Sequence, residues 1–215
     1  LGACAGGVLP PILADAPAVT ALSPHVLLAV ADPRRPEADT ARDALRHPAD
    51  IMAFAGVQPG WRIADVGPGG GYYTRLFSVA VGERGRVFAI DRPNAPDRPL
   101  DAIFISQIYH DFYLPALGID VPALDRQLFA ALKPGGVLII VDHAAVDGSD
   151  ISVTNTLHRI DQPQVVRDLT AVGFVLEAQS DVLRNPADDR SERVFEADIR
   201  GHTDQFVLRF RKHAN

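Results

Sequence analysis

The chain has 215 residues, of which 47% are hydrophobic and 22% are charged. This composition predicts one α/β domain with a sizeable core, preceded by an N-terminal extension. The formal net charge is −6, and lysines and arginines are scattered along the chain. That distribution argues against a nucleic-acid or anionic-membrane surface and favours a small molecule or a protein as the substrate. No apolar stretch approaches the roughly 20 residues that a membrane-spanning helix needs.

The N-terminal extension covers residues 1–35 and is rich in alanine and proline. Its first residues, Leu1-Gly2-Ala3-Cys4, are similar to the end of a bacterial lipoprotein signal peptide, and the tract at 13–16 would equally suit a cleavage region. The chain would then be periplasmic or lipid-anchored; the alternative is an ordinary Ala/Pro-rich tail in a cytoplasmic protein. We expect an extended arm with a short helical piece at 19–30, which could dock on a second copy of the chain in a homodimer.

The rest of the chain alternates predicted helices and strands. Helices are expected at 36–47, 49–55, 72–81, 121–132 and 162–171, and strands at 61–66, 86–91, 101–107, 136–142, 173–181 and 205–212. The last two strands are expected to pair as an antiparallel hairpin. On the first helix, Arg42, Asp43 and Arg46 are expected to form surface ion pairs.

A glycine-rich turn joins the strand at 61–66 to the next helix. It reads D-V-G-P-G-G-G, so that Asp65, Gly67, Gly69 and Gly71 occupy alternate positions. Glycine lets a backbone approach a ligand where a Cβ would collide, and the helix behind it offers unpaired N–H groups. The dinucleotide pattern G-x-G-x-x-G would need glycine where Tyr72 stands. The turn therefore predicts a nucleoside-binding loop, with Tyr72 either lining the ligand or only packing.

The following strand ends in Asp91. Nucleoside-binding α/β folds place a carboxylate at this point, where it accepts hydrogen bonds from the ribose hydroxyls. We therefore predict that Asp91 binds the ribose of the cofactor.

These motifs resemble those of a known enzyme superfamily. D-x-G-x-G-x-G is similar to motif I of the class I S-adenosylmethionine-dependent methyltransferases, and Leu132-Lys133-Pro134-Gly135-Gly136 is similar to the turn before their fifth strand. The resemblance implies a Rossmann-like, mostly parallel sheet with a C-terminal antiparallel hairpin, S-adenosylmethionine as the cofactor, and methyl transfer to a small-molecule acceptor. The alternative is a non-catalytic nucleoside-binding or structural protein that retains the fold.

Further stretches resemble a family of predicted, often exported bacterial methyltransferases of unassigned substrate. The similarity covers about residues 36–212 and is carried by stretches at 53–57, 67–77, 106–112, 141–143, 158–161 and 183–189. It implies an extracytoplasmic location and names no acceptor.

One segment departs from the superfamily pattern. Class I methyltransferases place a helix, a strand and a helix after the strand that ends at Asp91, yet only nine residues separate Asp91 from Asp101. Nine residues fall below the 10 to 12 of a usual parallel crossover. Either the third strand is lost, or the natural protein carries a segment that this sequence lacks; we favour the second, because loss of an edge strand would expose core.

A candidate catalytic cluster follows from the expected strand order. The strands at 101–107 and 136–142 should be neighbours, which brings His110 and Asp111 close to Asp142 and His143 at the ligand-binding end of the sheet. Methyl transfer to an O–H or N–H acceptor requires removal of a proton, so His110 is predicted as the general base, supported by Asp111 and His143. The same groups could instead hold a divalent metal. We favour the base and assign no metal ligand.

Two other features have simpler interpretations. Asp161 is predicted as the N-cap of the helix at 162–171, and the acidic run at 188–192 as a solvated loop. Arg159 could reach a substrate carboxylate.

Overall fold

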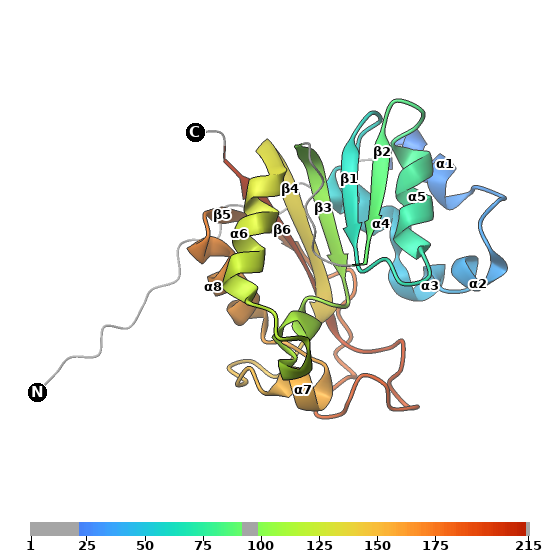
Figure 1. The fold of residues 1–215 in the computed structure, drawn as a ribbon. Coiled ribbons are helices and arrows are strands. Elements are labelled where there is room, and N and C mark those ends of the chain that lie inside the picture. The colour runs from blue at the N-terminus through green and yellow to red at the C-terminus, as the bar shows by residue number, and fades with distance from the viewer. Residues whose placement is uncertain (1–21, 92–98, 214–215) are drawn as a thin grey trace, which may run out of the picture.

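The computed structural model describes residues 22–91 and 99–213, which form one sheet between two layers of helices (Figure 1). The predicted lipobox at residues 1–4 lies outside the described residues, so the extracytoplasmic location and the homodimer through the arm stay predictions. Within the described ranges, no helix has the length and hydropathy that a membrane span requires.

The sheet has six strands in the order β2-β1-β3-β4-β6-β5. Their bounds are β1 Arg62–Val66, β2 Arg86–Ile90, β3 Leu100–Ser106, β4 Leu132–His143, β5 Phe174–Ser180 and β6 Gln205–Lys212. Strands β1 to β4 are parallel, whereas β6 is antiparallel to both β4 and β5. The predicted α/β fold, the adjacency of β3 and β4, and the C-terminal antiparallel pair are confirmed.

Both faces of the sheet are covered, which explains why β3 and β4 read as continuous apolar runs. Helices α1 Pro24–Val30, α4 Pro48–Ala55 and α5 Tyr72–Ala80 cover one face, and α6 Val121–Ala131 and α8 Gln162–Ala171 cover the other (Figure 1). Alternate residues of β3 belong to the two cores: Phe104 packs with the α5 side and Ile103 with the α6 side.

The predicted helix at 36–47 is two short helices, α2 Glu37–Thr40 and α3 Asp43–Arg46. Helix α3 ends because His47 adopts a left-handed conformation, with φ of 43°, before Pro48. Proline disfavours the helical region for the residue that precedes it. Helix α1 falls within the predicted arm, and it packs against the core through Val26 and Ala29.

Three short elements near the carboxyl end of the sheet were not predicted from the sequence. They are the 3₁₀ turns η1 His110–Tyr113 and η2 Pro115–Leu117, and the helix α7 Val153–Leu157. None is long enough to show a periodic apolar pattern.

The connection from β2 to β3 is shorter than the about 10 to 12 residues expected for a parallel crossover, yet it joins two parallel strands. Ile90 and Ile105 are both paired with Val66 of β1. To begin β3 at Leu100, the chain must therefore go back by the length of five residues and cross over β1. The straight distance from Ile90 to Leu100 is then about 20 Å. An extended chain from Ile90 to Leu100 reaches about 33 Å, so it can cross without a helix. The predicted extra segment would fall on residues 92–98, outside the described residues, and stays a prediction. Among the described strands, β2 and β5 are the two edges of the sheet.

Candidate functional site

The glycine turn lies at the carboxyl end of β1, where parallel sheets bind ligands. Gly67, Gly69 and Gly71 have φ angles of 64°, 51° and 78°, a region that residues with a Cβ rarely adopt. A Cβ at Gly67 would lie 2.1 Å from Cδ1 of Ile108, whereas one at Gly69 would meet open space. The turn is therefore tightly packed behind Gly67 and open beside Gly69.

Asp65, near the end of β1, helps to hold the glycine turn in place. Its carboxylate accepts a hydrogen bond from Thr74 Oγ1 at 2.5 Å, which ties the end of β1 to the first turn of α5. Burial raises the pKa of Asp65 to about 6, although the hydrogen bond from Thr74 acts in the opposite direction.

A cavity of about 220 Å³ opens in front of the turn. Its wall combines the glycine turn and the start of α5 with two other segments, one around α3 and one just after β3. The lining residues are Arg42, Arg46, Asp65, Gly67, Pro68, Gly69, Gly70, Tyr72, Tyr73, Ser106, Gln107 and Ile108. Pockets for drug-sized ligands usually exceed about 300 Å³, so this cavity suits one end of a nucleoside cofactor.

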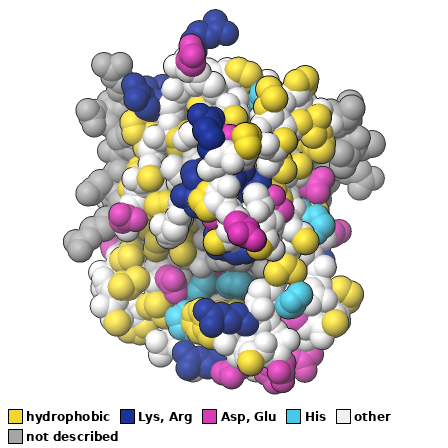
Figure 2. Space-filling model, turned by 90° about the vertical axis from the view of Figure 1, so that its right-hand side faces the viewer, with side chains coloured by type: hydrophobic (Ala, Val, Ile, Leu, Met, Phe, Trp, Pro, Cys, Tyr) yellow, Lys and Arg dark blue, Asp and Glu magenta, His cyan; other side chains and the backbone are white. Residues whose placement is uncertain are grey.

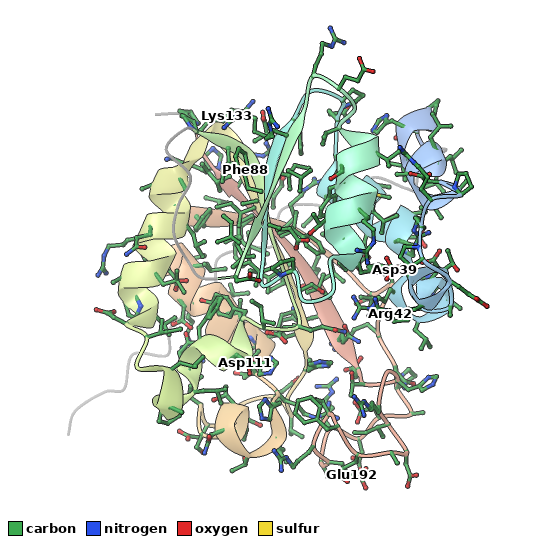
Figure 3. All side chains as sticks on the ribbon, turned by 45° about the vertical axis from the view of Figure 1, so that its right-hand side comes forward. Asp39, Arg42, Phe88, Asp111, Lys133 and Glu192 are labelled. Carbon is green, nitrogen blue, oxygen red and sulfur yellow. The ribbon has the colours of Figure 1, made fainter. Side chains whose placement is uncertain are left out.

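Arg46 is the cation of this cavity that the sequence did not single out. Its guanidinium stands 4.8 Å from the ring centroid of Tyr72 and donates to Gln107 Oε1 at 3.2 Å. No salt bridge of Arg46 occurs within the described ranges, and burial lowers the pKa of its guanidinium. The ion pairs expected on the surface are partly buried and form for its neighbours: Arg42 pairs with the buried Asp39 of α2, both labelled in Figure 3, and Asp43 pairs with the buried Arg35.

Of the two other predicted cofactor residues, one lines the cavity and the other does not. Tyr72 lines it, and its hydroxyl donates to Asp43 at 2.6 Å. Asp91 is exposed and does not line the cavity, but the preceding carbonyl, of Ile90, accepts a hydrogen bond from the Gly67 N–H at 2.8 Å. Asp91 therefore stands beside the turn, toward the edge of the sheet.

The predicted catalytic residues come together in a second group, the histidine cluster, defined as His110, Asp111, Asp142, His143 and His158. His110 is buried and directs Nδ1 to Asp142 Oδ1 at 2.7 Å and Nε2 to Asp111 Oδ1 at 3.1 Å. The ring centroid of His143 is 5.8 Å from that of His110. His158, which the sequence did not assign, directs Nδ1 to Asp111 Oδ1 at 3.2 Å.

The pKa values of the two predicted histidines are shifted in opposite directions. Burial alone would lower the pKa of His110, but the charges and hydrogen bonds of Asp142 and Asp111 outweigh it and raise the pKa to about 10. Burial lowers the pKa of His143 to about 4. At neutral pH His110 holds its proton between two carboxylates, and His143 is the neutral ring. The role of His110 as the general base stays a prediction.

A chain of hydrogen bonds joins the cavity to the histidine cluster. Arg46 donates to Gln107, whose Nε2 donates to Gln205 Oε1 at 3.0 Å. Gln205 Nε2 then contacts Thr203 Oγ1 at 3.4 Å, and Thr203 bonds His143 Nδ1 at 2.7 Å. Gln107 has a φ of 62°, unusual for a residue with a Cβ. The two groups are thus separate sites with a polar connection.

Two other sequence interpretations are wrong, and a third is confirmed in position only. Arg159 is fully buried and pairs with the buried Asp188 at 2.8 Å, so it does not face a substrate and the loop at 188–192 is not wholly solvated. Asp161 occupies the N-cap position of α8 without a capping hydrogen bond from its side chain, which accepts from the Gly148 N–H instead.

Comparison with known proteins points to methyltransferases. The family model of protein-L-isoaspartate(D-aspartate) O-methyltransferases matches residues 38–95, which run from α2 through the glycine turn past β2. The ubiquinone/menaquinone biosynthesis C-methyltransferase UbiE of Vibrio vulnificus is 27% identical over 180 residues. That match takes in 72% of this chain and 63% of the relative.

Solved structures share the fold. A SAM-dependent methyltransferase from Aquifex aeolicus superposes with a TM-score of 0.56 at 18% identity, over 80% of this chain and 93% of that one. The [4+2]-cyclase SpnF superposes with a TM-score of 0.52 at 18% identity, over 83% and 82% of the two chains. The chain has the class I methyltransferase fold, a fold that also occurs in an enzyme named for another reaction.

Proposed function

We propose that this chain binds S-adenosylmethionine beside the glycine turn and transfers the methyl group to a small-molecule acceptor. The observation that carries the proposal is the cavity itself, in which the backbone of Gly67, Gly69 and Gly70 shares the wall with Arg46, a half-buried cation that forms no salt bridge with any described residue. Sequence similarity to methyltransferases over most of the chain supports the same cofactor.

The described residues fit the methionine end of the cofactor. The open space beside Gly69 and Gly70 accommodates a ligand that side chains would exclude. Arg46 offers charge-assisted hydrogen bonds to a carboxylate, and the N-terminus of α5 adds N–H groups with a positive dipole. The ribose would extend past Gly67 toward Asp91, whose carboxylate can accept from its two hydroxyls.

Bound there, the cofactor supplies a methyl group on an activated sulfonium. The chain then has to hold the acceptor in line and exclude water, since alignment is the main requirement of such a displacement. Tyr72 and Tyr73 form an aromatic wall of the cavity next to the start of α5. For an acceptor that loses a proton, the predicted base is His110 of the histidine cluster, supported by Asp111 and His143.

Titration of the protein with S-adenosylmethionine and S-adenosylhomocysteine by calorimetry tests the cofactor. Arg46→Met should weaken binding by about 10- to 100-fold, because a hydrogen bond to a charged group contributes about 1.5 to 3 kcal/mol. Asp91→Ala should weaken it by about 5- to 100-fold, since two ribose hydroxyls lose their acceptor. Arg200→Met, at an exposed position, serves as the matched control.

Two outcomes would count against the proposal. Absence of binding by the wild-type chain contradicts the cofactor assignment. Binding without methyl transfer to a panel of phenols, catechols, amines and thiols would favour the non-catalytic alternative.

A further inference from the structure

Three side chains of the histidine cluster converge on one point. His110 Nε2 lies 3.1 Å and His158 Nδ1 lies 3.2 Å from the same oxygen, Oδ1 of Asp111. All three atoms lie within 4.8 Å of one another. Three ligands of a tetrahedral ion at about 2.0 to 2.1 Å are about 3.3 Å apart, so two of the three separations already suit a metal ion.

The orientation of His110 is fixed by a fourth residue. Asp142 is fully buried and accepts hydrogen bonds from the His110 backbone N–H at 2.8 Å and from Nδ1 at 2.7 Å. This leaves Nε2 as the nitrogen that faces Asp111. Histidines that bind metals characteristically donate their other ring N–H to a carboxylate in this way, which selects the tautomer and aims the ring.

The convergence requires a positive centre. Two ring nitrogens and a carboxylate oxygen are all electron-pair donors, so they can face one another closely only with protons or a metal ion between them. Protons satisfy this in a closed ion-pair network. A metal ion satisfies it with one position left for a fourth ligand.

The surroundings favour an accessible site. Asp111 and His158 are partly exposed, with 32% and 19% of their side chains accessible, although His110 is buried. Figure 2 shows histidine side chains set in a hollow on the face that it displays, and Figure 3 shows Asp111 at the lower end of the sheet.

His158 is held in place against a backbone cost. It has a φ of 54°, and its ring packs edge-on against Phe195 at a centroid distance of 4.8 Å. Residues with a Cβ in this conformation cost about 1 to 3 kcal/mol and concentrate at functional sites. The backbone conformation that directs this ring toward Asp111 therefore lowers the stability of the fold.

We propose that His110, Asp111 and His158 bind one first-row divalent metal ion of the Zn²⁺ type. Two imidazoles and one carboxylate suit such ions, whereas Mg²⁺ prefers oxygen ligands alone. Three protein ligands leave one tetrahedral position open to water or to an acceptor oxygen. In the metal-bound chain His110 is a ligand and cannot also be the general base, so this inference and the predicted base role exclude each other. It does not depend on the cofactor.

Metal binding can be measured directly on tag-free full-length protein stripped with a chelator. Co²⁺ titration followed by visible absorption should give one site per chain, with the intense bands of a four- or five-coordinate ion, and Zn²⁺ should displace it. Asp111→Asn and His158→Gln should each weaken Co²⁺ affinity by at least 100-fold. His202→Gln, which removes an exposed histidine elsewhere, should bind as the wild type does.

Circular dichroism of each variant shows whether it has folded. If His158→Gln does not fold, Asp111→Asn still tests the site, because asparagine has nearly the same shape as aspartate. Wild-type protein without a one-to-one Co²⁺ site overturns the inference, as does undiminished binding by folded Asp111→Asn protein. Titration of the same metal-free samples with S-adenosylmethionine is a separate readout: its failure would count against the proposed function only.

Discussion

The cavity and the histidine cluster lie at the same end of the sheet, yet they are built in opposite ways. Most of the cavity wall comes from one stretch, residues 65–73, in which Gly67, Gly69 and Gly70 present only backbone. The cluster draws its side chains from three separate segments, after β3, at the end of β4 and after α7. The cavity depends on glycines that are close together in the sequence, whereas the histidine cluster forms only when folding brings three distant segments together.

Their charges differ as well. The cavity contains the Arg46 guanidinium, which pairs with no carboxylate of residues 22–91 and 99–213 and so suits an anionic group such as the carboxylate of an amino-acid moiety. The cluster pairs its imidazoles with carboxylates, which suits a cation. Two neighbouring polar sites at the carboxyl end of one sheet can thus suit ligands of opposite charge.

The largest expected effect is on the cluster. Asp142→Ala removes the acceptor of three hydrogen bonds, from the backbone N–H groups of His110 and His143 and from the His110 ring. Breaking a buried pair of this kind costs about 3 to 5 kcal/mol. Chemical denaturation should show this loss, with Asp147→Ala, 87% exposed, as the control. A loss below about 1 kcal/mol would mean that the cluster is not a buried network.

A smaller, pH-dependent effect is expected under the cavity. The raised pKa of Asp65, about 6, means that the native state holds its proton more tightly than the unfolded state does. Its contribution is complete below pH 4 and is lost as the pH rises to about 6, on the order of 2 to 3 kcal/mol.

The measurement is the difference in unfolding free energy between Asp65→Asn and the wild type at several pH values. The variant should gain relative stability between pH 4 and 6, and the difference should be constant above about pH 7. A difference that does not vary with pH would show that Asp65 is not desolvated as described.

The smallest effect separates shape from charge in the cavity. Gly67→Ala places a Cβ in a left-handed conformation and against Ile108, at a cost of about 1 to 2 kcal/mol in stability. Affinity for S-adenosylmethionine should fall as well. Adding Ile108→Ala relieves the contact, so the double variant should recover part of the affinity in a double-mutant cycle. If the effects of the two substitutions simply add, contact with Ile108 is not what excludes a side chain at Gly67. Gly60→Ala is the control, because Gly60 also has a positive φ.

Much of this protein was readable from its sequence. Apolar runs of strand length, separated by helical patterns, predict the six strands. The mostly parallel sheet and the strand order came from the resemblance to class I methyltransferases. The glycine turn was equally readable, because the residues that need positive φ and close packing are contiguous. The short helices at 36–47 were not, since ion pairs with distant residues such as Arg75 hold them rather than an apolar stripe.

Only the tertiary structure decided how the polar side chains are shared between the two sites. Arg46 resembles its neighbour Arg42 in the sequence, but its hydrogen-bond partner, Gln107, is 61 residues away. His158 lies 47 residues from Asp111 and was assigned to no site. Local sequence sets conformation through steric limits on φ and ψ, whereas the partner, burial and charge state of a side chain depend on which distant segments the sheet brings beside it.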